Sequence, residues 1–222
     1  MKIVLTAIIF CITINVNSQV QLGLFAGPQA TTVHYLINGN KQDNSFKYGI
    51  NLGAQLKVPF ENRLSFVPSI MYNLRGYKVN FNAPSYPPDL LATDNNTSFH
   101  TVELGFLLQH DFNTEAAHWF FKIGPSLDFA LFGKETYHTP TATVKRNMIF
   151  GFGDYGHYLA SAIFQVGYEA GNGTFIYGHY NYSLTTMNNF DQGAKIGNRA
   201  VGISIGKNLS GKKIVVDTKN KQ

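Results

Sequence analysis

The residues of this sequence that could carry catalysis or bind a metal are few and widely spaced. The chain has seven histidines, and its single cysteine, Cys11, lies inside an apolar run. A serine nucleophile needs a histidine base within hydrogen-bond reach. His179 and Ser183 share one phase of an extended segment, but four residues of strand separate them by about 13 Å. His100 and His110 lie about 30 Å apart by the same rise, too far to share a metal ion. We therefore expect no catalysis, no cofactor and no metal site.

A second set of polar residues shares one side of the extended segments of the chain. Charged residues are only 14% of the sequence, against about 25% in an ordinary globular domain. Nine of them alternate with apolar neighbours and fall in phase with Gly and Ser. They are Lys47, Lys57, Arg63, Arg75, Glu103, Asp111, Lys122, Asp128 and Glu169. Because both signs are present, these side chains could form a network of ion pairs in an enclosed lumen.

Strands must position these residues, since period-two alternation recurs and no convincing helical period follows Gln19. Eight such segments occur, at residues 20–34, 46–58, 63–81, 99–112, 119–133, 158–170, 174–187 and 197–208. Short connections at 59–62, 113–118 and 171–173 alternate with longer ones at 36–45, 82–98, 134–157 and 188–196. This alternation is typical of membrane barrels with tight turns at one rim and loops at the other. We predict an all-β fold, an eight-stranded antiparallel up-and-down transmembrane β-barrel over residues 19–208, with both ends of the barrel at the short-turn rim.

The direction of the apolar face separates a membrane barrel from a soluble, lipocalin-like one. The interior of an eight-stranded barrel has room only for its own side chains or one small ligand. The bulky apolar residues of segment 119–133 would overfill it, whereas the charged face is narrow and rich in glycine. Aromatic residues of the apolar face also gather near both strand ends, as in the belts of membrane barrels. The predicted belts contain Phe46, Tyr48, Phe66, Tyr72, Phe112, Trp119, Tyr158 and Tyr168. We therefore expect the apolar face to contact outer-membrane lipid.

The two ends of the sequence predict export and a solvated tail. Residues 1–18 combine a lysine, an apolar run and small residues at positions 16 and 18, the pattern of a signal peptide cleaved before Gln19. The apolar run of about 12 residues is too short to span a bilayer as a helix. Five lysines lie between residues 207 and 221, and the rest of the chain is nearly neutral. Residues 209–222 are predicted to be a basic tail, and we expect no nucleic-acid binding.

Three segments resemble the small outer-membrane β-barrel family of Bacteroidetes, often called porin-family or PorT-like proteins. They are QLGLFAGPQATT at 21–32, LSFVPSIMYNLRGYKV at 64–79 and FKIGPSLDFALFG at 121–133. In the second, Pro68, Tyr72 and Gly76 match the family's third-strand pattern. The resemblance spans nearly the whole predicted mature chain, and its motifs are structural. It implies an outer-membrane location and, as one alternative, an accessory role in protein secretion across that membrane.

These features predict a structural or interaction role in the outer membrane. A pore is disfavoured because side chains plug an eight-stranded lumen, and a lipid-modifying enzyme is disfavoured by the spacing of His179 and Ser183. The longest predicted loop, residues 134–157, carries exposed apolar residues that could contact a protein partner. The same loop could instead fold over the mouth of the barrel. Both interpretations remain open at this point.

Overall fold

The computed structural model describes residues 20–191 and 193–209, and its regular elements there are all strands. The strands are β1 (Gln21–Ile37), β2 (Asn40–Lys41), β3 (Asp43–Glu61), β4 (Leu64–Asn80), β5 (Asp94–Asp111), β6 (His118–His138), β7 (Thr143–Asn147), β8 (Tyr158–Glu169), β9 (Thr174–Ser183) and β10 (Lys195–Leu209). Within the described residues there is no helix long and apolar enough to cross a membrane. The predicted signal peptide at 1–18 and residues 210–222 of the predicted tail lie outside the described residues.

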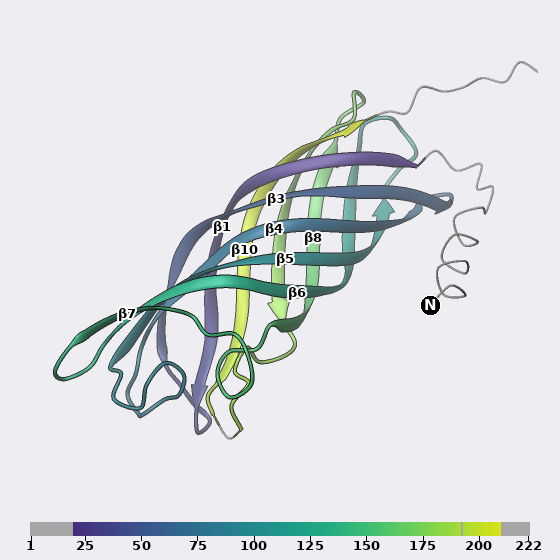
Figure 1. Cartoon of the computed structure of the whole chain (residues 1–222). Coiled ribbons are helices and arrows are strands. Elements are labelled where there is room, and N and C mark those ends of the chain that lie inside the picture. Colours follow the sequence, from purple (N-terminus) through teal and green to yellow (C-terminus); the bar gives the residue numbers. More distant parts are fainter. Residues whose placement is uncertain (1–19, 192, 210–222) are drawn as a thin grey trace, which may run out of the picture.

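The strands form a closed antiparallel barrel (Figure 1). The order β10-β9-β8-β6-β5-β4-β3-β1 runs around the wall, and pairing of β1 with β10 closes it. The short strand β2 pairs with β1 and the short strand β7 pairs with β6, so eight strands make the wall. Leu22 lies opposite Leu209, which places the start of β1 and the end of β10 at the same rim. The predicted eight-stranded up-and-down barrel is confirmed.

Several wall strands are longer than a membrane requires. β3 has 19 residues and β6 has 21, whereas a tilted transmembrane strand needs about 9–11. The surplus lies at the long-loop end, where β6 and β7 form a hairpin that projects beyond the barrel body (Figure 1). This end therefore carries a β-sheet that extends past the span expected for the membrane.

The first predicted long connection, residues 36–45, is wrong as a loop. β1 continues to Ile37, which pairs directly with Asn40 across a two-residue turn. Asn38 and Gly39 have φ angles of 49° and 81°. Positive φ at both central residues defines a type I′ turn, for which Asn-Gly is the preferred sequence. The long-loop rim therefore contains one tight hairpin.

The predicted loop 134–157 also contains regular structure. Thr101 pairs with Ala130 but His100 pairs with Phe132, so Leu131 is an extra residue in β6. A bulge of this kind leaves one residue unpaired and shifts the alternation of the strand. After it, Gly133, Glu135 and Tyr137 turn inward, and β6 continues to His138 before pairing back with β7.

The two faces of the wall have the polarity predicted for a membrane barrel, but the lumen also holds large rings. Phe106 and Ile203 are 42% and 58% exposed on the outside, whereas Glu103 inside is 1% exposed. A buried apolar cluster inside the barrel joins Phe25, Val67, Met71, Leu107, Phe120, Ile163, Phe175 and Tyr177. The expectation of an interior filled only by small and charged residues is therefore wrong. Glycines on neighbouring strands make room for the rings, as Gly167 does for Phe120.

Substituting Gly167 with alanine is expected to destabilise the barrel by about 1–3 kcal/mol, the usual cost of overpacking. A Cβ at this position would lie 2.5 Å from the Phe120 ring and 2.6 Å from Tyr177 Cβ. The matched control is Gly178→Ala on β9, where the nearest atom would be 3.9 Å away. Urea unfolding of both variants refolded in phospholipid vesicles measures the difference. Equal midpoints for the two variants would contradict the predicted clash.

Candidate functional site

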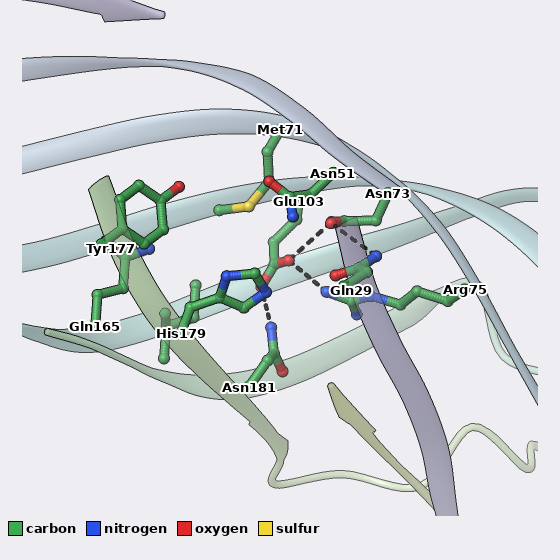
Figure 2. A pocket seen from close by; sticks show the side chains of 11 residues that line it. Gln29, Asn51, Met71, Asn73, Arg75, Glu103, Gln165, Tyr177, His179 and Asn181 are labelled. Carbon is green, nitrogen blue, oxygen red and sulfur yellow. Dashed lines mark hydrogen bonds and ion pairs between the residues drawn. The ribbon is translucent and has the colours of Figure 1, made fainter. Parts of the chain in front are cut away.

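A buried ion cluster lies in the lumen, where Arg75 of β4 meets Glu103 of β5 (Figure 2). The Nη2 atom of Arg75 is 2.5 Å from Glu103 Oε2, and its Nη1 atom is 2.9 Å from Asp128 Oδ2. Glu103 and Asp128 are directly opposite each other on β5 and β6. Like charges in that arrangement repel each other. The Arg75 guanidinium therefore offsets the repulsion and holds the two carboxylates together.

Neutral donors complete the hydrogen bonding of this cluster. Glu103 Oε1 accepts from Ser126 Oγ and Asn181 Nδ2, both at 2.6 Å, and Glu103 Oε2 accepts from Asn73 Nδ2 at 3.0 Å. These donors come from β4, β6 and β9, so the cluster joins strands on several sides of the lumen. Buried charges are tolerated when they are both paired and hydrogen-bonded. The arrangement is suited to fixing the barrel in one state.

A second ion cluster closes the short-turn end of the lumen. Lys57 Nζ is 3.0 Å from Asp111 Oδ2 and 3.3 Å from Glu169 Oε2. His118 Nε2 lies 3.3 Å from Asp111 Oδ1, and its Nδ1 atom bonds to the carbonyl oxygen of Glu115. Lys57, Asp111 and Glu169 were predicted on the lumen face, whereas His118 was not. The reason is that His118 was assigned to a connection, whereas it is the first residue of β6.

Lys122 lies apart from the carboxylates and contacts aromatic rings. Its Nζ atom donates to Gln55 Oε1 at 2.8 Å and sits 4.8 Å from the Phe120 ring centroid and 5.3 Å from that of Tyr177. Ring faces attract a cation electrostatically. Lys122 thus links the charged part of the lumen to the apolar cluster around Phe120.

Besides Lys122, two other predicted members of the lumen network lie elsewhere or lack an ionic partner among the described residues. Arg63 is exposed in the turn between β3 and β4, where its Nη1 atom donates to the carbonyl of Phe112. The prediction for Arg63 is wrong, because the alternation was extended one residue too far into the turn. Lys47 is half-buried near the long-loop end, and its Nζ atom donates to Asn96 Oδ1 and Ser98 Oγ at 2.7 and 2.6 Å.

Seven of the eight predicted belt residues lie on the outer face of wall strands, and Phe112 is exposed in the turn directly after β5; together they form two groups. Near the short turns are Phe66, Phe112, Trp119 and Tyr168, and toward the long-loop end are Phe46, Tyr48, Tyr72 and Tyr158. The rings of Trp119 and Tyr168 pack edge to face with centroids 5.4 Å apart. Tyr48 is 91% exposed. Such exposure of a large ring is suited to a membrane interface, where one side of the ring meets lipid and the other meets water.

The lumen has almost no free space at its centre. The cavity around Arg75, Glu103 and His179 has a volume of about 10 Å³ (Figure 2), close to the minimum for one water molecule. His179 points into this cavity, whereas Ser183 Oγ donates to the carbonyl of Thr185 at 2.9 Å. His179 and Ser183, which were considered as base and nucleophile, are therefore not hydrogen-bonded to each other in the structure.

A third charged cluster, at the long-loop end, was not predicted. Glu135 is 1% exposed, and its carboxylate accepts from Arg146 Nε at 2.7 Å and from Tyr155 Oη at 2.8 Å. Burial raises the pKa of Asp154, whose Oδ2 accepts from Tyr86 Oη. Loops 81–93 and 148–157 meet residues 184–191 and 193–194 here, over a buried apolar cluster that includes Tyr155. Part of the predicted interaction loop therefore does fold over the mouth of the barrel.

The sequence pattern of the family described as outer membrane protein beta-barrel domain matches residues 15–189. The protein belongs to this family. A comparison with curated proteins gives no match. Among solved structures, the barrel is similar to Ail, the attachment invasion locus protein of Yersinia pestis, with 14% identity and a TM-score of 0.41 over 84% of this chain and 97% of that one. It is also similar to neisserial surface protein A, with 11% identity and a TM-score of 0.43 over 86% of this chain and 98% of that one. A third similar structure is OprG from Pseudomonas aeruginosa, with 9% identity and a TM-score of 0.47 over 87% of this chain and 97% of that one.

Membership of this outer-membrane family places the protein in the outer membrane and gives the barrel its orientation. Barrels of this kind have short turns toward the periplasm and longer loops outside. The turns at residues 62–63 and 170–173 are therefore periplasmic, and the β6–β7 hairpin is extracellular. In the middle of β10, the outward residues from the outer to the periplasmic side are Arg199, Val201, Ile203, Ile205 and Lys207. Two cations thus flank an apolar band, as expected where long side chains reach the two interfaces.

Proposed function

We propose that this protein is an outer-membrane anchor that presents an extracellular sheet edge to a partner protein. The observation that carries the proposal is β7, which pairs only with β6 among the described strands. Figure 1 shows the β6–β7 hairpin standing clear of the barrel body. An exposed edge strand can accept a strand from another chain through main-chain hydrogen bonds.

The hydrogen-bond parity of β7 identifies the residues that face outward. Met148 N donates to the carbonyl of Gly133, and Ala142 O accepts from Thr139 N. In an antiparallel pair the bonded residues alternate, so the backbone groups of Val144 and Arg146 point toward β6. Those of residues 143, 145 and 147 point away from β6 and are available to a further strand.

The hairpin is held in place by buried contacts, so the edge is ready for binding. Arg146 bonds to Glu135 across β6 and β7, and its Nη2 atom donates to the carbonyl of Pro88 at 3.1 Å. Next to the hairpin, Ile149 and Phe152 are 54% and 97% exposed. We expect the partner segment to be extended, with apolar residues for this surface and an acidic residue near Lys145.

The test is photo-crosslinking in cells that express the protein with a photo-crosslinking amino acid at residue 147. Lys145 is then substituted with proline in the same protein. Proline at 145 removes an outward N–H and leaves the β6–β7 ladder intact. We expect a defined crosslinked adduct in the unsubstituted chain and in the Lys145→Ala control, and its loss in Lys145→Pro. Unchanged heat-modifiable gel migration checks that all the barrels are folded. An adduct that survives Lys145→Pro would refute strand addition at this edge, and so would a hairpin that forms no adduct.

An accessory part in protein secretion is the second candidate, supported by the resemblance to PorT-like proteins of Bacteroidetes. Deletion of the gene separates the two candidates. Loss of secreted cargo favours the secretion role, and unchanged secretion with altered detergent sensitivity favours an anchor. Neither candidate includes catalysis or a cofactor. Modification of lipid A or peptide by the purified protein, abolished in Ser183→Ala, would contradict both.

A further inference from the structure

We propose that an outward-facing groove between β9, β10 and β1 binds the phosphate of an outer-leaflet glycolipid. The groove exists because the three strands end at different heights. β9 ends at Ser183, whereas β1 runs to Ile37 and its partner β10 begins at Lys195. The resulting hollow in the wall has a volume of about 220 Å³.

The groove concentrates positive charge without a carboxylate. Among its lining residues are Arg199, Lys195 and His34, and none of them is acidic. Arg199 lies opposite Thr32, and Lys195 lies opposite Leu36, so His34 sits diagonally between the two cations. Such diagonal neighbours are about 7–8 Å apart, which lets long side chains converge on one group. Within residues 20–191 and 193–209, none of the three takes part in an ion pair.

The Arg199 guanidinium is oriented and partly unsatisfied. It lies 5.2 Å from the centroid of the Tyr182 ring, a stacking that leaves its N–H groups directed sideways. Its Nε atom is buried and has no hydrogen-bond partner. A buried donor without a partner is unfavourable, and a phosphate oxygen would satisfy it with a charge-assisted bond.

The depth of the groove selects a lipid over a free anion. On β10, Arg199 precedes the exposed apolar side chain of Val201 by two residues and lies about 7 Å farther out along the strand. Lys195 is four residues farther still. The cations thus lie where lipid headgroups meet the apolar band, and exposed Tyr180 and Val201 beneath them form a surface for an acyl chain.

The test compares binding of lipid A to the full barrel in detergent micelles, measured by native mass spectrometry. We expect Arg199→Gln and Lys195→Gln each to weaken binding about tenfold or more, the effect of losing one charge-assisted bond. The control is Lys207→Gln, an outward cation at the periplasmic end of the same strand, and it should bind as the unsubstituted chain does. Added salt should weaken the interaction.

Three further measurements decide the proposal. Enzymatically dephosphorylated lipid A should bind the unsubstituted chain and the Arg199→Gln variant with the same affinity. Inorganic phosphate alone should bind the unsubstituted chain far more weakly than lipid A does. Heat-modifiable migration should be the same for all variants. The proposal is overturned if Lys207→Gln weakens binding as much as Arg199→Gln does, or if dephosphorylated lipid binds equally well. It is also overturned if inorganic phosphate binds as tightly as the lipid, which would indicate a site for a free anion.

Discussion

Replacement of Arg75 with methionine is expected to lower the free energy of unfolding by about 3–5 kcal/mol, the range for breaking a buried ion pair from one side. The substitution leaves Glu103 and Asp128 facing each other across β5 and β6 without a cation. Both side chains are 1% exposed, so water cannot take over the role of Arg75. Urea unfolding of the refolded protein in phospholipid vesicles measures the loss.

Two further variants make the test of the Arg75 cluster specific. Lys78→Met removes an exposed cation from the same strand and should change stability by less than about 1 kcal/mol. Adding Glu103→Gln and Asp128→Asn to Arg75→Met removes the unpaired charges and should recover part of the loss. If Arg75→Met cost no more than Lys78→Met, the cluster would be solvated and would not fix the barrel.

The two faces of the wall could be predicted from the sequence. The period-two alternation defines the faces, and the small interior volume of an eight-stranded barrel requires the bulky apolar face to point outward. Glu103 was assigned to the lumen face by its phase alone, and the barrel buries it there, whereas Ile203 in the opposite phase of its own strand is exposed outside. Which charges meet could not be predicted from phase. The contact between Arg75 and Asp128 crosses from β4 to β6, and it depends on strand register and on the tilt of the strands.

The features missed by sequence reasoning share a local cause. The Asn38-Gly39 turn carried a strong hairpin signal, which the regular spacing of short and long connections obscured. The bulge at Leu131 adds one residue, and that single residue reverses the face of Glu135. No period-two reading extends across such a bulge. The extracellular cluster was therefore hidden although the residues that form it are polar and conspicuous.

The aromatic rings in the lumen could not be predicted from the interior volume of the barrel alone. Phe120 is in phase with Lys122 and Asp128 of the charged face, but it was not named among the predicted lumen residues. Gly167 lies on the neighbouring strand β8, directly opposite Phe120 in the ladder. A ring and a glycine together occupy about the space of two medium side chains. Pairing of this kind depends on strand register, which a period-two pattern does not determine.

The second large effect is expected for Ile203→Arg, which should destabilise the barrel in vesicles by about 2–4 kcal/mol. Ile203 is 58% exposed and stands four residues from both Arg199 and Lys207 on β10. That is about 13 Å from each cation along the strand. An arginine there would lie near the middle of the apolar band and would have to reach an interface through hydrocarbon.

The cost of an outward arginine is expected to depend on the depth of the substituted residue in the membrane. Val201→Arg places the same side chain one outward position closer to Arg199, where it can extend to the outer interface. The cost of arginine falls to about 0–1 kcal/mol near an interface, so Val201→Arg should be clearly milder than Ile203→Arg. A solvent-facing wall would make both variants nearly neutral, and a lumen-facing one would make both severe. Only contact with lipid gives a penalty that grows toward the centre of the strand.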